Sequence, residues 1–317
     1  MLQTDLHHQE PKLATGSLLE PIPTGLSADN TVNLQIGDVC CSFRSNDDEI
    51  CNLLQQTYNV FLTEKSPDIT IELESTDRMK PEDLYKALSK TEYFHDKKKR
   101  FRTSSKIISG QYDLEKRFIR IIGEKSLINP DMENNHLNKL LAMSYYSACK
   151  VKYGDVPPAM LIHASGILRH GQVLMFTGPS EAGKTTVATL CREQDWEVIN
   201  DEILLVSQPG ATIKNIEVRS APFLGRFTPN RQVTAPLRSI FMLKKSHRIL
   251  TRPLDRTEAY VKMMRQIITP AYIGQSSKRA VLALIADFSK ALTEAVPIYE
   301  LEFTLDGESL WKTVDEP

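Results

Sequence analysis

Cysteine is scarce in this sequence, and the few cysteines present form no recognisable pattern. There are five in 317 residues; Cys40 and Cys41 are adjacent and the others are scattered. An odd, irregularly spaced set excludes a disulfide framework, and the lack of a C-x-x-C pair excludes the commonest zinc patterns. We therefore expect a protein of the reducing cytoplasm, in which the adjacent pair consists of ordinary strand residues.

Long apolar runs and an excess of one charge are also missing. No stretch approaches the roughly 20 apolar residues of a membrane-spanning helix, and the N-terminal residues lack the pattern of a signal peptide. The formal net charge is −1, so composition gives no argument for binding to nucleic acid or to an anionic membrane. The one dense basic run, KKKRFR (Lys97–Arg102), is typical of a solvated turn before a strand. Contact with an acidic partner or with nucleotide phosphates is the alternative interpretation.

The chain is long enough for two packed domains. We predict a flexible tail over residues 1–30, a smaller N-terminal α/β domain over 31–155 and a second α/β domain over 156–317. The tail is polar, has no sustained period, and contains a His7–His8 pair without a third metal ligand nearby. The boundary between the domains is placed at GDVPPA (Gly154–Ala159), which interrupts a helical pattern.

Periodicity of the apolar residues predicts the elements of both domains. In the first domain, strands are expected at residues 32–36, 39–43, 69–74, 106–114 and 116–123, and helices at 49–62, 81–89 and 134–152. In the second domain, helices are expected at 184–193 and within 255–268 and 276–295, strands at 196–199 and 296–303, and a terminal turn at 306–311.

The strongest local pattern is a short hairpin that leads into a glycine-rich loop. The β runs MLIHASGIL and QVLMFTG are separated only by RHG. A link this short favours antiparallel pairing, because a parallel βαβ unit needs a crossover of a dozen residues or more. The sequence therefore predicts a mixed sheet in the second domain.

The loop itself, GPSEAGKTT, matches the phosphate-binding pattern G-x-x-x-x-G-K-[ST]. Its two glycines let the backbone N–H groups point at a β-phosphate, and the following helix adds its positive N-terminal end. Lys184 is expected to contact the β- and γ-phosphates, and the Thr185 hydroxyl to bind Mg²⁺. Glu181 is expected to point outward, because an acidic side chain facing the phosphates would repel them. The predicted ATP-binding residues are Gly178, Pro179, Ser180, Glu181, Ala182, Gly183, Lys184, Thr185 and Thr186.

A phosphate loop also needs a carboxylate for its metal ion, and the sequence offers two places for it. AVLALIADF ends near Asp287, but its apolar residues recur at helical intervals, so Asp287 is predicted to be an exposed helix residue. INDE instead delivers Asp201 and Glu202 at the end of a β run, where neighbouring strand ends converge on a ligand. An acidic turn without function is the alternative for this pair.

The stretch HASGILRHGQVLMFTGPSEAGKTTVATL, followed by WEVINDE, resembles the catalytic core of HPr kinase/phosphorylase and its relatives, including lasso-peptide kinases. The resemblance covers residues 161–207 well and residues 221–227 and 236–243 weakly, and it does not securely reach the first predicted domain. It implies the nucleotide fold of phosphoenolpyruvate carboxykinase, with a mixed sheet. In that family a histidine-bearing strand precedes the hairpin, and an Asp-Asp or Asp-Glu pair follows the helix of the loop. His163 and Asp201–Glu202 occupy these positions here.

The resemblance implies a role for each of these residues. Asp201 is expected to be the catalytic base, with Thr185, Asp201 and Glu202 around Mg²⁺. His163 is expected to orient Asp201 or to contact the γ-phosphate. Of the arginines beside APFLGRF, Arg226 is the one assigned to the transferring phosphoryl group, and Arg219 is the alternative. Surface arginines without a role remain an open interpretation for both.

These observations predict an ATP-dependent kinase that phosphorylates a hydroxyl of a protein, peptide or small molecule. The arginine-containing C-terminal signature of the HPr-specific enzymes is not located, so HPr as the acceptor and the reverse reaction are not implied. A phosphate-loop ATPase, or a nucleotide-binding regulator without phosphotransfer, is the alternative, although no LSGGQ-type signature follows the loop. Relatives assemble into rings, which leaves a homo-oligomer open. No nucleic acid or membrane partner is expected.

Overall fold

The computed structural model describes residues 30–76, 93–95, 100–103, 108–125, 136–194, 196–208, 216–269 and 278–315. Almost all of the predicted tail, including His7–His8, and the predicted helix at 81–89 lie outside the described residues. In the basic run, the described part begins at Arg100, the first residue of a strand.

Alternation of apolar and polar residues builds a first mixed sheet. In ITIELE, for example, Ile69, Ile71 and Leu73 are buried, while the residues between them are partly exposed. The strand order is β1-β2-β3-β7-β6-β5-β4, with parallel pairing of β3 to both β2 and β7. The strands are β1 (Thr31–Ile36), β2 (Val39–Ser45), β3 (Ile69–Thr76), β4 (Tyr93–His95), β5 (Arg100–Thr103), β6 (Ile108–Asp113) and β7 (Phe118–Glu124).

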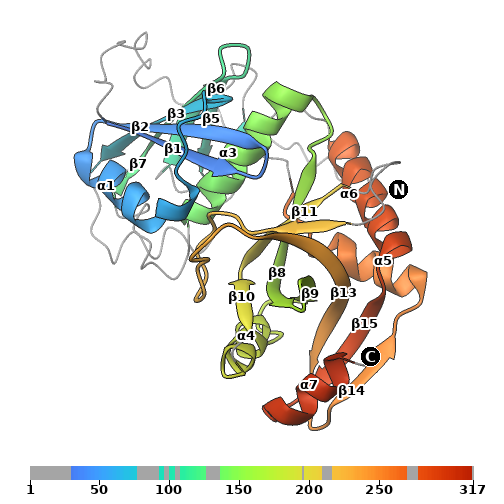
Figure 1. The fold of residues 1–317 in the computed structure, drawn as a ribbon. Helices are drawn as coiled ribbons and strands as arrows, with labels where there is room; N and C mark the ends of the chain where they lie inside the picture. Colours follow the sequence, from blue (N-terminus) through green and yellow to red (C-terminus); the bar gives the residue numbers. More distant parts are fainter. Residues whose placement is uncertain are drawn as a thin grey trace, which may run out of the picture.

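Two helices pack on this sheet. Helix α1 (Asp48–Thr57) begins after Asp47, whose side chain accepts a hydrogen bond from the backbone N–H of Glu49 and so caps the helix. A short 3₁₀ turn, η1 (Asn59–Phe61), follows it. Helix α3 (His136–Tyr153) is buried along most of its length and contacts β2 and β3. Figure 1 shows α3 lying between the first sheet and the rest of the molecule.

The second sheet is also mixed, which confirms the α/β fold class expected from the sequence. Its pairings close a ring through β8, β11, β12, β13 and β9, and the long strand β13 bends visibly around it (Figure 1). Strands β10, β15 and β14 extend the sheet beyond the ring. The strands are β8 (Ala159–Arg169), β9 (Gln172–Thr177), β10 (Glu197–Asn200), β11 (Ile203–Ser207), β12 (Glu217–Arg219), β13 (Thr234–Lys245), β14 (Leu250–Pro253) and β15 (Ile298–Phe303).

The predicted antiparallel hairpin is confirmed. Strands β8 and β9 pair from Ala164 with Thr177 to Arg169 with Gln172, and only two residues connect them. Those residues, His170 and Gly171, both have positive φ, 49° and 73°. This is the backbone of the two-residue turn that matches the twist of a hairpin.

Four helices flank the second sheet: α4 (Lys184–Arg192), α5 (Arg256–Met264), α6 (Lys278–Ala295) and α7 (Gly307–Asp315). The first three agree with the predicted helices. The prediction of a terminal turn at 306–311 is wrong, because the chain forms helix α7 there. Asp306 accepts hydrogen bonds from Ser309 at the start of this helix. Leu310, Trp311 and Val314 then bury one face of it against α4 and the sheet.

One hydrophobic cluster runs through both sheets. It joins β1–β3 and β7 to α3, to the strands of the second sheet and to α5 and α6. A second, smaller cluster lies between the other face of the second sheet and helices α4 and α7. An ion pair between Arg219 on β12 and Asp38 in the β1–β2 turn, with N–O distance 2.7 Å, also crosses from one sheet to the other.

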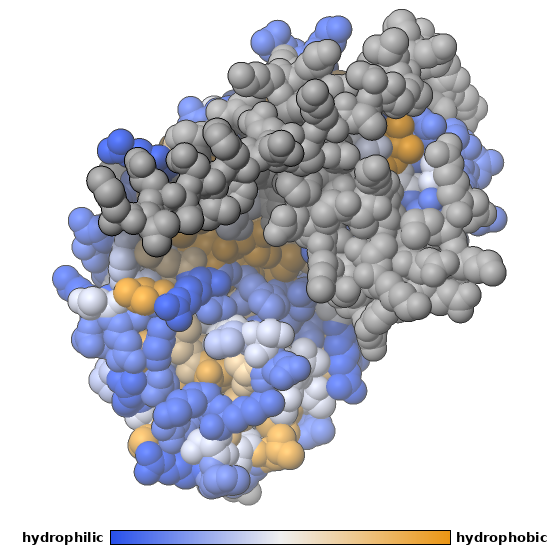
Figure 2. All heavy atoms as spheres, turned by 180° about the vertical axis from the view of Figure 1, so that it is seen from behind, coloured by the Kyte–Doolittle hydropathy of each residue, from blue (hydrophilic) through white to orange (hydrophobic). Residues whose placement is uncertain are grey.

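Figure 2 shows one face of the molecule, with a hydrophobic area at its middle beside the residues drawn in grey. Most of the lower half of the face in Figure 2 is hydrophilic, with small separate hydrophobic patches. The exposed large hydrophobic residues of the described part are scattered along the chain: Leu62, Tyr153, Val156, Leu250, Val261, Leu282 and Leu305. Among the described residues, no helix is long and apolar enough to span a membrane.

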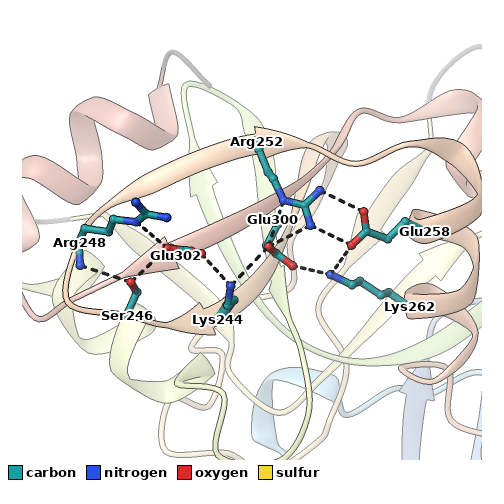
Figure 3. Close-up of polar contacts among 8 residues, drawn as sticks. All are labelled: Lys244, Ser246, Arg248, Arg252, Glu258, Lys262, Glu300 and Glu302. Atoms are coloured by element: carbon teal, nitrogen blue, oxygen red, sulfur yellow. Dashed lines mark hydrogen bonds and ion pairs between the residues drawn. The ribbon is translucent and has the colours of Figure 1, made fainter.

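A network of charged side chains covers the face of the sheet next to α5 (Figure 3). At its centre the buried Glu300 accepts hydrogen bonds from Arg252 at 3.1 Å and from Lys262 at 2.5 Å. Burial raises the pKa of Glu300, but the two cations outweigh it and hold the pKa below its ordinary value. The members of this network are Lys244, Ser246, Arg248, Arg252, Glu258, Lys262, Glu300 and Glu302.

We expect Glu300→Gln to lower the free energy of unfolding by about 1.5–3 kcal/mol at pH 7, because two cations lose a buried charged acceptor. A carboxylate with a depressed pKa stabilises the fold above its unfolded pKa and loses this effect as the pH falls. The difference between wild type and variant should therefore shrink in acid, which urea unfolding at several pH values measures. Glu294→Gln, on the exposed face of α6, is the control. An equal effect of the two substitutions would contradict the role of the network.

Candidate active site

The phosphate loop connects β9 to α4, and its two glycines are required by close packing. A Cβ atom on Gly178 would lie 2.9 Å from the Cβ of Ala182 and 3.3 Å from the carbonyl oxygen of Leu243. A Cβ atom on Gly183 would lie 2.5 Å from the ring of Phe303, and Gly183 has a φ of 105°, which only glycine adopts readily. The loop is thus pressed against the ends of β13 and β15.

Lys184 lies inside this loop. Its side chain is buried, and Nζ donates hydrogen bonds to the carbonyl oxygens of Gly178 and Pro179, each at 3.1 Å. Burial lowers the pKa of Lys184, and the nearby charge of Glu202 raises it in part. The carboxylate of Glu202 is thus a negative charge that favours the protonated form of the loop lysine.

The other loop residues differ in exposure. Pro179, Ser180 and Glu181 are exposed, whereas Ala182 and Thr185 are partly buried. The outward direction expected for Glu181 stays a prediction. Thr186 is also partly buried. Glu181 has a positive φ of 63°, which turns the backbone at the tip of the loop.

The turn between β10 and β11 carries the predicted acidic pair, and a buried asparagine shapes it. The Asn200 side-chain oxygen accepts hydrogen bonds from the backbone N–H groups of Glu202 at 2.7 Å and Ile203 at 3.0 Å. Its Nδ2 donates to the carbonyl of Phe223 at 2.7 Å. The sequence analysis missed Asn200, although its position directly before the pair is the local pattern of an asparagine turn.

Asp201 is buried, and one of its oxygens is already occupied. Oδ1 accepts a hydrogen bond from the backbone N–H of Phe227 at 2.9 Å. Its other oxygen, Oδ2, has no hydrogen-bond partner among the described residues. Gly225 packs so closely on this carboxylate that a Cβ atom there would lie 2.2 Å from Oδ1. The loop 221–227 therefore holds Asp201 in one orientation.

We expect Gly225→Ala to displace Asp201 and to lower the free energy of unfolding by about 1–3 kcal/mol, the usual cost of overpacking. Urea unfolding measures this loss of stability. Gly307→Ala is the matched control, because a Cβ atom there meets only ordinary contacts at 3.6 and 3.7 Å. A Gly225→Ala variant as stable as this control would contradict the packing argument.

His163, which is expected from the sequence to orient Asp201 or to contact the γ-phosphate, lies beside Glu202. His163 Nε2 lies 3.4 Å from Glu202 Oε1, and both side chains are about one-third or more exposed, at 34% and 42%. The backbone N–H of Ala164 also donates to the carbonyl of Glu202 at 3.2 Å. Strand β8 thus places the imidazole beside the second acidic residue, on the open side of the site.

A glutamine that the sequence analysis did not single out lies beneath this group. The carbonyl of Gln266, just after α5, accepts a hydrogen bond from the backbone N–H of His163 at 2.9 Å. Its side-chain oxygen accepts from the Thr177 hydroxyl at 3.4 Å, and the same hydroxyl donates to the carbonyl of His163 at 2.7 Å. No local pattern marks Gln266, because its partners are far away in the sequence.

The two arginines near loop 221–227 lie in different surroundings. The guanidinium group of Arg219 forms ion pairs with Asp38 and Glu217. Arg226 is exposed, and its guanidinium carbon lies 5.9 Å from the ring centre of Phe227, next to the residue that holds Asp201. Of the two, only Arg226 is free of ion pairs within the described part of the chain.

The same loop is fixed to α3 by an asparagine. Asn138 donates to the carbonyl of Leu224 and accepts from its backbone N–H, both at 2.7 Å. The helix between the two sheets therefore supports the loop that holds Asp201. Sequence analysis missed Asn138, as it missed Gln266, because its partner is far away in the sequence.

The residues present fit a magnesium ion better than a fully protein-bound metal. No group of three or more His, Cys, Asp or Glu side chains that would suit a metal ion occurs among the described residues. Mg²⁺ usually takes one or two carboxylates and completes its shell with water and substrate phosphates. Two adjacent carboxylates, on Asp201 and Glu202, are a ligand set of this kind. Asp287 is exposed on α6, as predicted, and takes no part.

Comparison with known proteins adds the following. A family described as "SynChlorMet cassette protein ScmC" matches residues 127–316, more than half of the chain. The matched part contains the phosphate loop, the acidic pair and loop 221–227, and excludes the first sheet. The solved structure of the Hpr(Ser) kinase/phosphatase from Coxiella burnetii is similar with a TM-score of 0.26 and 8% sequence identity, over 48% of this chain and 91% of that chain. No curated protein matches.

Proposed function

Because this chain belongs to the ScmC family, and because its matched part joins a phosphate loop to two carboxylates, we propose that it is an ATP-dependent kinase. It transfers the γ-phosphate of ATP to a hydroxyl group of a protein, peptide or small molecule, with Mg²⁺ as cofactor. The fold proposed for this part is that of HPr kinase and phosphoenolpyruvate carboxykinase, and residues 156–317 form the kinase domain.

One observation carries this proposal. Asp201, which follows the first strand after the phosphate-loop helix, is buried, and the backbone N–H of Phe227 holds its Oδ1 at 2.9 Å. A nucleotide-binding site needs only the lysine and the loop, whereas a phosphotransfer site also needs a carboxylate fixed near the terminal phosphate. We assign this second role to the anchored Asp201.

The proposal gives each side chain of the site a role. The phosphate loop binds the β- and γ-phosphates through its N–H groups and Lys184. Mg²⁺, when bound, neutralises charge on these phosphates, and the residues that hold it are Thr185, Glu202 and Asp201. His163 keeps Glu202 on the open side of the site. Arg226 contacts the transferring phosphoryl group from loop 221–227.

In the transfer step, Oδ2 of Asp201 takes the proton of the acceptor hydroxyl. The acceptor oxygen forms a bond to the γ-phosphorus as the bond from that phosphorus to the β–γ bridging oxygen breaks. ADP leaves with the electron pair of the broken bond. The backbone N–H of Phe227 occupies Oδ1, which leaves Oδ2 as the oxygen that takes the proton.

The alternative is an ATPase, and dependence on an acceptor separates the two. The test measures ATP consumption with labelled ATP, alone and with a panel of candidate proteins, peptides and metabolites that carry hydroxyl groups. A kinase consumes ATP in step with labelled acceptor and little without it. Steady hydrolysis that no acceptor increases would favour the ATPase instead.

A further inference from the structure

Strands β13 and β15 run past the end of β9 and flank the phosphate loop. Strand β13 is parallel to β9, and its last pair with it is Met242 with Thr177, the residue before the loop. β13 then continues for three residues, pairing with β15 up to Lys245 opposite Phe303. The first of these residues, Leu243, lies against the loop, since its backbone atoms are 3.3 and 3.6 Å from where a Cβ of Gly178 would be.

The two lysines at the end of β13 point to opposite faces of the sheet. Lys244 belongs to the charge network on the α5 face, where it donates to Glu302 at 2.7 Å (Figure 3). Successive strand residues alternate between faces, so Lys245 shares the other face with Leu243 and Phe303. Both of these pack with α4, the helix that begins at the phosphate loop.

Lys245 is also placed close to the end of the loop. Its strand partner Phe303 is the residue whose ring blocks a Cβ atom on Gly183, at 2.5 Å. Adjacent strands are about 5 Å apart, and a lysine side chain extends slightly further than that. Lys245 is exposed, and no carboxylate forms an ion pair with it among the described residues. It is a free cation beside the loop, while the lysine next to it is neutralised.

We propose that Lys245 is a second nucleotide-binding cation, which contacts the polyphosphate of ATP from the outer side of the phosphate loop. This inference rests on the proposed nucleotide-binding function. In this proposal Lys184 contacts the polyphosphate from inside the loop, and His163 and Glu202 lie on the side of β8. Lys245 then contacts the polyphosphate from the side of β13 and β15. A lysine suits this position because its ammonium group is a compact point charge on a flexible stem.

The test measures binding of ATP, with Mg²⁺, to the full chain by titration calorimetry at low and at moderate salt. Lys245→Gln should weaken ATP binding about tenfold, which corresponds to about 1.4 kcal/mol, and reduce the dependence of affinity on salt. Lys245→Arg should restore most of the affinity. Lys244→Gln removes the same charge one residue away, on the opposite face, and should bind ATP like wild type.

The outcomes separate this inference from the function on which it rests. If Lys184→Ala abolishes binding but Lys245→Gln and Lys244→Gln bind ATP equally well, Lys245 has no such role and the nucleotide site stands. If Lys245→Arg fails to restore what Lys245→Gln loses, charge is not the cause and the inference is overturned. If wild type itself binds no ATP, the proposed function fails first.

Discussion

Asp201→Asn is expected to lower the rate of phosphoryl transfer by about 10²-fold or more, the usual effect of losing a general base. Asparagine keeps a side-chain oxygen that can accept the hydrogen bond from Phe227, so loop 221–227 should remain in place. The amide nitrogen that replaces Oδ2 cannot take a proton from the acceptor hydroxyl. ATP affinity should therefore stay near that of wild type, while single-turnover transfer to the acceptor becomes slow.

Two further measurements make this result decisive. Thermal unfolding of Asp201→Asn should match wild type, which would exclude a disturbed loop as the cause of the loss. Phosphoryl transfer by the variant at the wild-type rate would contradict the assignment of Asp201 as base. In that case Glu202, the more exposed carboxylate beside His163, becomes the group to replace next.

Lys184→Ala should reduce nucleotide binding and turnover together, with a loss of about 10²–10³-fold in the transfer rate. The lysine is buried within the loop, and two loop carbonyls hold its ammonium group in the place where phosphate charge is expected. Its removal takes away a charge that acts where water is largely excluded, so its effect is larger than that of a surface cation. Binding of ATP by calorimetry and transfer of labelled phosphate are the two measurements.

Replacement by arginine is the informative companion of this variant. Lys184→Arg keeps the charge but cannot enter the same space between Gly178 and Pro179 without moving the loop. We therefore expect it to fail as well. Full activity in Lys184→Arg would mean that charge alone matters, and that the geometry of the loop around this residue does not.

The parts of the fold that sequence reasoning found are those encoded by neighbouring residues. The hairpin of β8 and β9 follows from a two-residue link, and the phosphate loop from spacing within nine residues. The helical interval around Asp287 correctly separated a helix from a strand. Helix α7 was missed because DGESLW reads locally as a turn, and its helix is stabilised by packing of Leu310 and Trp311 on a distant cluster.

The finer geometry of the site depends on contacts between distant residues, which no local pattern contains. Asn138 reaches Leu224 across 86 positions, and Gln266 reaches Thr177 across 89. The resemblance gave Asp201 and Glu202 different roles, but the sequence contains no information on how each side chain is surrounded. Only the fold shows that one is enclosed by loop 221–227 and the other lies open beside His163.

The core that continues from one sheet into the other limits how this protein can move. Enzymes that close over ATP commonly do so by rotating two lobes about a flexible joint, and a joint of that kind needs a thin, mostly polar boundary. Here α3 and the Arg219–Asp38 pair occupy that boundary. Under the proposed function, we therefore expect the loops around the phosphates, and not a rotation of the two sheets, to close over the substrates. We also expect the two sheets to unfold together on heating, in a single cooperative transition.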